Sequence, residues 1–386
     1  MKRLVAVSSS FLPFHGGQEI GLVSLLHGLR QEADWEVSVV TPAYDPAWKR
    51  EEVYDGIPVI RYPSTVVRYP TQRMPHSFNL AVHMAYARAF IPPLLRRLAP
   101  DRILAYFLAP TAHTATRYAR AHGIPSVLFL GGSDVFTRGW PVWGAMRGAM
   151  RDADRVLATS RFVRDSARMC LRLPDKPVDL LPYPIDLRRF PCVPPPPRSG
   201  TLRLLCVQRL VPLKGTRILL LALARAMAGG PAAVHLDVVG DGVQRAELEA
   251  LAGSLGISAA VTFHGERPED EVAGFYQRAD VFCFPTLAEG FGIVLLEAMA
   301  TGRIVLASDC SAIPEILDHG RRGVLVEAGS VDAWANALRR VIGDPDAFAP
   351  LARAAREAAL AYDVGPVGRR LAALLDDVRA GAGEGA

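Results

Sequence analysis

The chain has 386 residues, half of them hydrophobic, which is enough for two domains that each bury a core. Its five cysteines are scattered without a close pair, so the spacing excludes a disulfide framework and a zinc site and favours a reducing, cytoplasmic compartment. The N-terminus passes directly into a short strand-like run, and no stretch approaches ~20 uninterrupted apolar residues, so neither a signal peptide nor a membrane span is expected.

The net charge of +5 is divided unevenly along the chain. Residues 1–192 carry 25 Lys or Arg against 16 Asp or Glu, a net charge of +9, whereas residues 193–386 carry 19 against 23, a net charge of −4. A basic N-terminal half suits an anionic acceptor or peripheral contact with an anionic membrane at its inner face. The alternative is a solvated, arginine-rich surface. The arginines are dispersed and accompany no recognised motif, which argues against nucleic acid.

The first half alternates strand and helix patterns, which predicts a mainly parallel sheet covered on both faces. The expected strands are 3–8, 36–41, 59–62, 102–106, 126–130 and 155–159, and the expected helices are 19–30, 79–98, 111–122, 143–151 and 161–171. The proline-rich run 191–197 reads as a stiff linker, so a boundary is expected at about 185–199. The first domain is therefore predicted at 1–190.

The second half repeats the alternation and predicts a second doubly wound domain at 199–364. Its expected strands are 202–207, 234–239, 261–264, 281–284, 304–307 and 323–326, and its expected helices are 216–227, 243–255, 270–277, 292–300, 312–317, 331–341 and 348–362. A last helix at about 365–380 is expected to pack back onto the first domain. The predicted fold class is thus α/β, with two Rossmann-like domains facing each other across a cleft.

The stretch from Glu289 to Glu297 holds two acids with seven residues between them and a Gly-Phe-Gly directly after the first. It lies between a buried strand and an apolar helix, so Glu289 falls at a strand's carboxyl end, where open α/β sheets bind ligands. Bare amides of a helix N-terminus can meet a phosphate, and a carboxylate can accept hydrogen bonds from a ribose diol. This spacing predicts a nucleotide-sugar site. The alternative is a dipole-favoured acid plus a solvated helix glutamate.

Three further strand-to-loop junctions carry polar or glycine residues. Arg209 and Lys214 follow the strand at 202–207, and two cations there would hold a diphosphate. Gly240-Asp241-Gly242 and Gly16-Gly17 each follow a strand and open a helix. Neither glycine cluster completes a G-x-G-x-x-G, so the dehydrogenase interpretation is excluded.

These motifs together resemble retaining glycosyltransferase family four, whose members have the GT-B fold. The resemblance rests, in chain order, on Gly16-Gly17, Gln208-Arg209-Leu210 with Lys214-Gly215, Gly240-Asp241-Gly242, and the acid-x7-acid stretch from Glu289 to Glu297. Further similarities are the segment 182–190, which resembles the family's Pro-Asn-Gly-Val-Asp…Phe, and the segment 311–316. The resemblance covers nearly the whole chain and is strongest over 200–330.

The resemblance implies a role for each matching residue. Arg209 and Lys214 would hold the diphosphate, Glu297 the ribose hydroxyls and Glu289 the hydroxyls of the transferred sugar. The amides of Gly290, Phe291, Gly292, Ile293 and Val294 would meet the sugar and the distal phosphate. The remaining donor-side positions are Gly16, Gly17, Gly240 and Arg267, the last through its main chain.

The sequence departs from the family pattern at two positions. Where members often have His-Gly-x-Asp, with the histidine near the reacting sugar, this chain has Gly131-Gly132-Ser133-Asp134. His113, Ser133 and Asp134 are the acceptor-side candidates, although a helix histidine such as His113 more often serves packing. The second departure is Gln208, which replaces the usual glycine and is expected only to alter the turn before Arg209.

The resemblance implies a retaining hexosyltransferase that needs no metal and no cofactor beyond its nucleotide-sugar substrate. A UDP-sugar is favoured as donor and a GDP-sugar comes next. The acceptor is expected to be a sugar, a lipid-linked glycan or a small metabolite. A sugar-nucleotide epimerase, a glycosyl phosphorylase and a non-catalytic nucleotide-sugar-binding protein are the alternatives.

Overall fold

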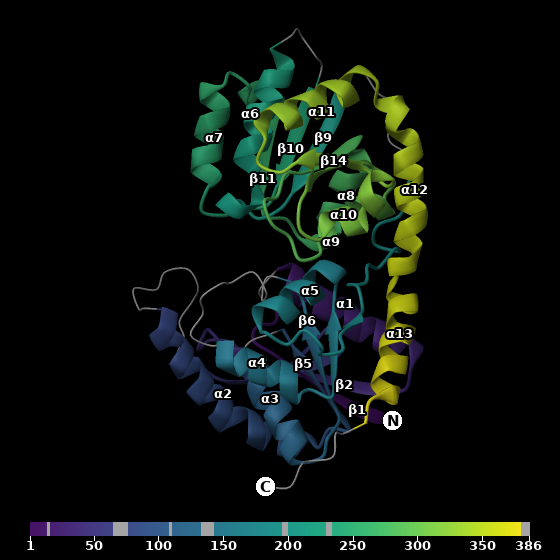
Figure 1. Cartoon of the computed structure of the whole chain (residues 1–386). Helices are drawn as coiled ribbons and strands as arrows, with labels where there is room; N and C mark the ends of the chain where they lie inside the picture. The colour runs from purple at the N-terminus through teal and green to yellow at the C-terminus, as the bar shows by residue number, and fades with distance from the viewer. Residues whose placement is uncertain are drawn as a thin grey trace. The chain divides into compact units, whose positions relative to one another are not determined.

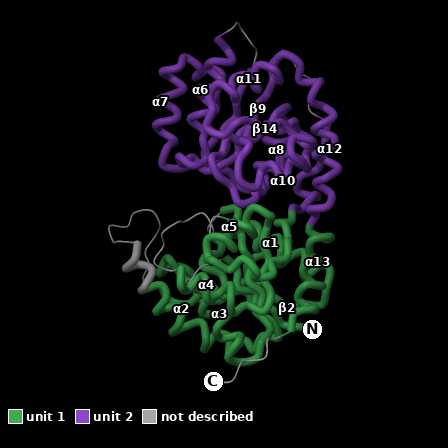
Figure 2. Tube along the Cα trace, in the orientation of Figure 1, with its two compact units in different colours: residues 1–184, 364–386 green, residues 185–363 purple. Residues whose placement is uncertain are grey.

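The computed structural model describes residues 1–13, 16–64, 76–107, 110–132, 143–194, 200–228 and 234–379. The chain divides into two compact units, which Figure 2 distinguishes by colour. Unit 1 comprises residues 1–184 and 364–386, and unit 2 comprises residues 185–363. The chain therefore leaves unit 1 just before the proline-rich run and returns to it with its last helix.

The sheet of unit 1 has eight strands in the order β3-β4-β2-β1-β5-β6-β7-β8. The strands are β1 Lys2–Ser8, β2 Trp35–Ala43, β3 Glu51–Tyr54, β4 Ile57–Pro63, β5 Arg102–Tyr106, β6 Ser126–Leu130, β7 Arg155–Ala158 and β8 Asp179–Leu180. Strand β3 pairs antiparallel with β4, and the other neighbours pair parallel. The near-continuous burial of β1, β5 and β6 follows from helices on both faces.

The helices of unit 1 form two groups. They are α1 Gly17–Glu32, α2 His76–Leu98, α3 Pro110–Ala121, α4 Trp143–Asp152, α5 Arg161–Cys170 and α13 Val364–Asp377. Helices α2, α3 and α4 pack side by side, whereas α13 packs on α1 (Figure 1). A Cβ added at Gly368 of α13 would lie 2.3 Å from the Gly28 backbone of α1. The C-terminal helix thus belongs to unit 1 through a backbone-to-backbone contact that requires glycine.

The sheet of unit 2 has six parallel strands in the order β11-β10-β9-β12-β13-β14. They are β9 Leu202–Val207, β10 Val234–Val239, β11 Val261–Gly265, β12 Val281–Phe284, β13 Ile304–Asp309 and β14 Val324–Glu327. Numbered along the chain, this order is 3-2-1-4-5-6, the doubly wound arrangement of nucleotide-binding folds. Such a sheet reverses its winding between β9 and β12, and ligands bind outside the carboxyl ends of the strands at that point.

The helices that cover this sheet are short and begin close to the predicted positions. They are α6 Thr216–Met227, α7 Arg245–Ser254, α8 Glu269–Arg278, α9 Ile293–Ala300, α10 Ile313–Ile316, α11 Val331–Gly343 and α12 Ala349–Ala359. The core between sheet and helices includes Trp334 and Leu338 of α11, both fully buried. Every strand and helix predicted from the sequence is present, and the structure adds β3 and β8.

Candidate functional site

The predicted nucleotide-sugar residues of unit 2 gather at the reversal of the sheet. Lys214 ends the short helical turn Pro212–Lys214 after β9, and Glu289 lies in the loop after β12. Because β9 and β12 are neighbours, the two loops leave the same edge of the sheet side by side. The acid and the cation that the sequence singled out separately therefore meet.

Lys214 and Glu289 form an ion pair in which Nζ lies 2.5 Å from Oε2. Their side chains are only 15% and 18% exposed, so the pair is screened far less than a surface pair. Nζ also lies 5.5 Å from the centre of the Phe284 ring. The other carboxylate oxygen of Glu289 accepts a hydrogen bond from its neighbouring Gly290 amide at 3.1 Å. Both charged groups are thus held at the strand ends.

The loop that carries Lys214 is pressed against the loop after β12. Gly215 has a φ of 68°, and a Cβ there would lie 2.1 Å from the Pro285 carbonyl oxygen. The Leu287 amide donates to the Leu213 carbonyl at 2.8 Å across the same junction. Glycine after the lysine is therefore required both by the left-handed backbone and by the close approach.

Gln208 has a structural role that the sequence did not reveal. Its Nε2 donates hydrogen bonds of 2.9 Å to the Lys214 carbonyl and to the Thr216 hydroxyl, and the residue is 7% exposed. The family's glycine could make neither bond. The prediction that Gln208 only alters the turn is incomplete, because its side chain also holds the backbone that presents Lys214.

The Gly-Asp-Gly turn after β10 packs directly on the strand end that leads to Arg209. A Cβ at Gly240 would lie 2.0 Å from the Gln208 carbonyl, and one at Gly242 would lie 2.4 Å from the Leu210 carbonyl. The Leu210 amide donates to the Asp241 carbonyl at 2.8 Å. Gly240 is therefore needed for loop packing, and Arg209 projects from this junction as an exposed side chain. Within the part of the chain that the structure describes, Arg209 has no ion-pair partner.

Helix α9 begins beside Glu289. Gly292 precedes it with a φ of 91°, and the Cγ of Glu289 lies 3.3 Å from where a Gly292 Cβ would be. The first-turn amides of Ile293 and Val294 have no intrahelical acceptor, as in any helix. The Phe291 ring is buried and lies 6.1 Å from that of Tyr362, so only the Phe291 backbone can serve a ligand.

Glu297 lies in the second turn of α9 and is 6% exposed. Burial raises the pKa of its carboxyl to about 7, a hydrogen bond with Tyr276 opposes this shift, and Glu269 adds to it. Among the described residues Oε2 has no hydrogen-bond partner. The alternative of a solvated helix glutamate is therefore wrong, since the carboxyl is buried with one oxygen left for a donor.

Arg267 follows β11 and is exposed. Its guanidinium donates to the His264 carbonyl at 3.1 Å and pairs with Glu271 at 3.5 Å. The side chain is thus occupied by local partners, and the predicted main-chain contact with a base stays a prediction.

In unit 1, Gly16 and Gly17 form the start of α1. A Cβ at Gly16 would lie 2.6 Å from Oε2 of Glu19, a residue that is 7% exposed and accepts a hydrogen bond from the Ser10 hydroxyl. Glu19 is a buried acid that the sequence analysis did not single out. An acid in the first turn of a helix is its only sequence signal, and that signal is common.

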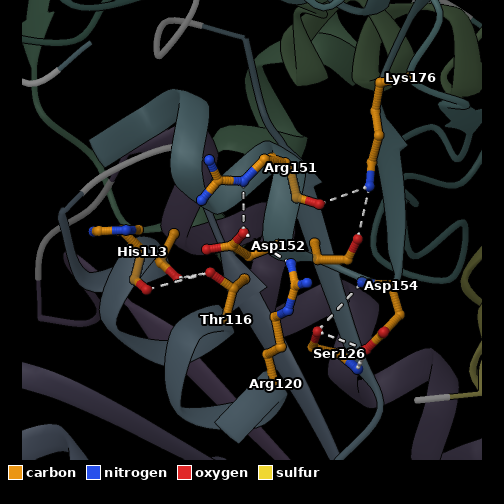
Figure 3. Close-up of polar contacts among 10 residues, drawn as sticks. His113, Thr116, Arg120, Ser126, Arg151, Asp152, Asp154 and Lys176 are labelled. Carbon is orange, nitrogen blue, oxygen red and sulfur yellow. Dashed lines mark hydrogen bonds and ion pairs between the residues drawn. The ribbon is translucent and has the colours of Figure 1, made fainter. Parts of the chain in front are cut away.

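His113 lies in the first turns of α3 and packs on α4 (Figure 3). Its Nε2 lies 2.8 Å from where a Cβ of Gly148 would be. Burial first, and then the charges of Arg88, Arg117 and Arg151, lower the pKa of His113, while Asp152 opposes them. The geometry favours the packing alternative over a sugar contact. The other acceptor-side candidates, Ser133 and Asp134, lie outside the described residues.

The surroundings of His113 are held by ordinary structural contacts, which Figure 3 shows. Lys176 donates to the carbonyls of Arg151 and Ala153 at the end of α4, at 3.1 and 2.8 Å. Asp154 accepts from the amide and the hydroxyl of Ser126 at 2.8 and 2.9 Å. These bonds satisfy a helix C-terminus and fix a strand start.

The apolar and basic segment 90–97 of α2, with Trp140 and Trp143, is a candidate for contact with a membrane, but the segment turns its apolar residues inward. Ile91 and Leu95 are fully buried, and Phe90 and Leu94 pack against the same core. Trp143 also packs there, and Trp140 lies outside the described residues. These apolar side chains therefore belong to the core of unit 1. Among the described residues no helix is long and apolar enough to cross a membrane.

Across the described ranges no group of three or more His, Cys, Asp or Glu side chains is placed to hold a metal ion. The polar groups at the edge of the unit 2 sheet are instead two cations, two acids and the start of a helix. A nucleoside diphosphate carries the groups that such a set can bind.

Comparison with known proteins identifies the class to which this fold and site belong. Residues 15–189 match the family described as Glycosyltransferase Family 4, and residues 195–360 match Glycosyl transferases group 1. Sucrose-phosphate synthase from Thermosynechococcus elongatus has the same fold, with a TM-score of 0.79 and 22% identity over 97% of this chain and 98% of its own. Anabaena Alr3699/HepE, solved with UDP and glucose, gives a TM-score of 0.73 and 21% identity over 97% and 100%.

One curated relative matches this chain over nearly its whole length. The GDP-mannose-dependent alpha-(1-6)-phosphatidylinositol monomannoside mannosyltransferase of Mycobacterium tuberculosis is 30% identical over 92% of this chain and 93% of its own length. The chain therefore belongs to glycosyltransferase family 4 and has the GT-B fold. Its enzyme class is that of a glycosyltransferase.

Proposed function

We propose that the protein transfers a hexosyl-type sugar from a nucleoside-diphosphate sugar to an acceptor hydroxyl, with retention at the anomeric carbon and without a metal ion. The observation that carries this proposal is the Lys214–Glu289 pair at the reversal of the unit 2 sheet. One member of the pair suits a phosphate and the other suits sugar hydroxyls. A donor that enters here separates the two and gives each its own partner.

A GDP-sugar, with mannose first, is the donor to test before others. The sequence alone ranked UDP ahead of GDP. The full-length relative at 30% identity is named for GDP-mannose, whereas the UDP complex belongs to a structure only 21% identical. The relative's name supports the reversed order, and UDP-hexoses remain the second donor class.

Arg209, Lys214 and the start of α9 act on the leaving group. As the bond between the anomeric carbon and the phosphate oxygen breaks, its electron pair stays on the diphosphate, and the two cations and the helix amides stabilise that charge by several kcal/mol. They take the place of a divalent metal. The acceptor oxygen attacks from the same face, and its proton passes to the leaving phosphate oxygen. Glu289 holds the sugar hydroxyls and is not a nucleophile.

Glu297 and the loop glycines hold the rest of the donor. The unpartnered Oε2 of Glu297 accepts a hydrogen bond from a ribose hydroxyl, which removes the cost of a buried acceptor without a donor. The Gly16–Gly17 backbone lets the start of α1 approach the phosphates.

For the acceptor, we propose a phosphate-bearing glycolipid at an anionic bilayer. Helices α2, α3 and α4, which pack side by side, carry seven arginines and one carboxylate, Asp152. Arg88, Arg117 and Arg151, one from each helix, are exposed, and their charges all lower the pKa of His113. The M. tuberculosis relative is named for a phosphatidylinositol monomannoside, which supports an acceptor of this chemistry.

The deciding experiment incubates the protein with GDP-mannose, UDP-glucose and other nucleotide sugars, with and without glycolipid extracts, in the presence of a chelator. Release of nucleoside diphosphate together with a glycosylated product, at an unchanged rate in the chelator, supports the proposal. Turnover without acceptor indicates an epimerase, and dependence on inorganic phosphate indicates a phosphorylase. Donor binding without turnover in any extract indicates a binding protein, and loss of activity with the chelator contradicts the metal-free mechanism.

A further inference from the structure

Gly131 stands where the family pattern has a histidine, and the structure shows what fills the space. A Cβ at Gly131 would lie 2.4 Å from the hydroxyl oxygen of Tyr183 and 2.6 Å from the Phe107 ring. No side chain fits at position 131 unless Tyr183 moves. Tyr183 itself stands in the segment 182–190, at the position of the asparagine in the family's Pro-Asn-Gly. This further departure and the one at Gly131, 52 residues apart by their numbers, are thus in direct contact.

The Tyr183 ring is wedged between α1 and the end of β6. A Cβ at Gly21 of α1 would lie 2.5 Å from two of its ring carbons, and the Phe129 ring of β6 lies 5.5 Å from it. Tyr183 is 3% exposed. The glycine in the helix and the glycine after the strand together form the slot that a tyrosine fills.

The Tyr183 hydroxyl continues into a chain of hydrogen bonds. The Tyr106 oxygen lies 2.9 Å from the Tyr183 oxygen and 2.7 Å from the Gln18 carbonyl oxygen. A carbonyl can only accept, so Tyr106 donates its single proton to Gln18 and Tyr183 donates to Tyr106. These hydrogen bonds thus connect Tyr183, which lies beside the end of β6, with Tyr106 at the end of β5 and with the first turn of α1.

This chain of hydrogen bonds lies where the sheet of unit 1 reverses its winding. Without the edge strand β3, the parallel strands from β4 to β7 also follow the order 3-2-1-4-5-6, with the reversal between β1 and β5. Tyr106 ends β5, and Gln18 directly follows Gly16 and Gly17 after β1. The hydrogen bond from Tyr106 to Gln18 therefore spans the place where a doubly wound sheet receives its ligand.

We propose that Tyr183 is a positioning residue that replaces the family's histidine by a different means. Through Tyr106 it fixes the Gln18 carbonyl, and so the orientation of the Gly16–Gly17 amides, instead of contacting the sugar from position 131. This inference rests on the proposed function, because it assumes that these amides meet the donor phosphates. A bond that only held the core together would affect unfolding but not the rate of transfer.

The test compares Tyr183→Phe, Tyr106→Phe and the double variant with the wild type. Each single variant keeps its ring and loses one hydroxyl, so the melting temperature should fall by only ~2–4 °C. We expect kcat to fall about tenfold in each, with the KM for the donor changed less, since the amides act mainly on the charge that develops in the transition state. The double variant should be no slower than the slower single variant, because both remove the same link.

Tyr118→Phe is the matched control, a buried tyrosine of α3 outside this chain of bonds, and it should keep the wild-type rate. Hydrogen exchange gives a readout that needs no activity: the Ile20 amide, which donates to the Gly16 carbonyl at 3.1 Å, should exchange faster in both single variants. The inference is overturned if the single variants keep kcat and KM within twofold, or if Ile20 exchange is unchanged. An inactive wild type would instead contradict the proposed function, while the exchange measurement would still decide the role of Tyr183.

Discussion

The Nζ of Lys214 lies 2.5 Å from Oε2 of Glu289, although 75 residues separate them in the chain. Each of the two side chains thus fills the position at which a ligand group would bind the other. Under the proposed function, a donor phosphate takes Lys214 from Glu289 while the sugar hydroxyls satisfy the released carboxylate. Such an exchange would leave both charges partnered, which matters because unpairing a largely buried ion is costly.

Replacing either cation should slow the reaction far more than it changes the fold. We expect Lys214→Ala and Arg209→Ala each to lower turnover on the order of 10²-fold, about 2.7 kcal/mol of transition-state stabilisation. Arg217→Ala removes an exposed cation of α6 that pairs with Glu247, and it is the control that should leave turnover unchanged. Near wild-type rates in folded Lys214→Ala and Arg209→Ala would show that neither residue serves the diphosphate.

Substitutions of the two acids should have different effects, one on nucleotide binding and the other on turnover. Glu297→Ala is expected mainly to raise the Kd for the nucleotide, because a ribose contact is the same in the ground state and the transition state. Glu289→Ala is expected mainly to lower kcat, because the contacts of the reacting sugar change along the reaction. Calorimetry with the nucleotide alone and steady-state kinetics separate the effects. The opposite division would exchange the two assignments.

The pH dependence of nucleotide binding should follow Glu297. Its pKa of about 7 means that the carboxyl is partly protonated at neutral pH, and the ionised form accepts a stronger hydrogen bond from a ribose hydroxyl than the protonated form does. Affinity should therefore rise as pH rises from 6 to 8, with release of protons. Calorimetry in buffers of different ionisation enthalpy measures that release. Glu297→Gln should abolish both effects, and a wild type that binds equally at both pH values would exclude this linkage.

The raised pKa of Glu297 also predicts that the stability of the fold falls as pH rises, whereas nucleotide affinity rises. Its pKa is raised above the ordinary value of 4.5, so the folded state binds the proton more tightly than the unfolded state. Between pH 4.5 and 7 the contribution to the free energy of unfolding therefore falls as pH rises, by on the order of 3 kcal/mol at most. Urea unfolding at pH 5 and pH 8 should show this loss in the wild type. It should be absent from Glu297→Gln, and equal losses in both proteins would assign the effect to other groups.

The parts of the site that sequence could predict are those encoded in one short segment. The Glu289–Glu297 stretch contains its own strand end, glycines and helix start, so its location followed from local rules. Strand β3 was encoded just as locally, because Asp55 and Gly56, with φ of 48° and 73°, form the two-residue turn between Tyr54 and Ile57. The Asp-Gly dipeptide is the sequence signal for such a hairpin turn.

The remaining parts depend on side-chain contacts that no sequence pattern indicates. Nothing near Gln208 in the sequence indicates that its amide reaches the carbonyl of Lys214, and nothing near Gly131 indicates Tyr183. The bond from Gln208 to Lys214 closes within the single loop after β9, whereas Gly131 follows β6 and Tyr183 follows β8, with β7 between them. A departure from a family pattern marked each position, but only the structure shows what the new residue touches.

Gln208 should matter because of its two hydrogen bonds. We expect Gln208→Gly, which restores the family residue, to lower turnover about tenfold, since the Lys214 carbonyl loses its donor and the loop gains freedom. Gln208→Glu keeps the shape but presents oxygens to that carbonyl, and it should be at least as slow. Thr216→Val removes only the second bond and should have the smaller effect. Full activity in Gln208→Glu would exclude a role in positioning Lys214.

The arginines of α2, α3 and α4 should bind anionic vesicles by charge alone, because the apolar side chains of the 90–97 segment are buried in the core or pack against it. Binding to phosphatidylglycerol vesicles should be strong at low salt and lost at high salt, as screening predicts.

At about 1 kcal/mol for each arginine near the surface, the double variant Arg117→Ala with Arg147→Ala should reduce partitioning roughly 30-fold at low salt. The control removes the same charge from unit 2, as Arg321→Ala with Arg339→Ala, both exposed residues, and should bind like the wild type. Co-sedimentation across a salt series measures all three proteins. Equal losses in the two double variants would mean that net charge, and not this face, attracts the vesicle. A wild type that stays in the supernatant at low salt would contradict docking altogether and point to a soluble acceptor.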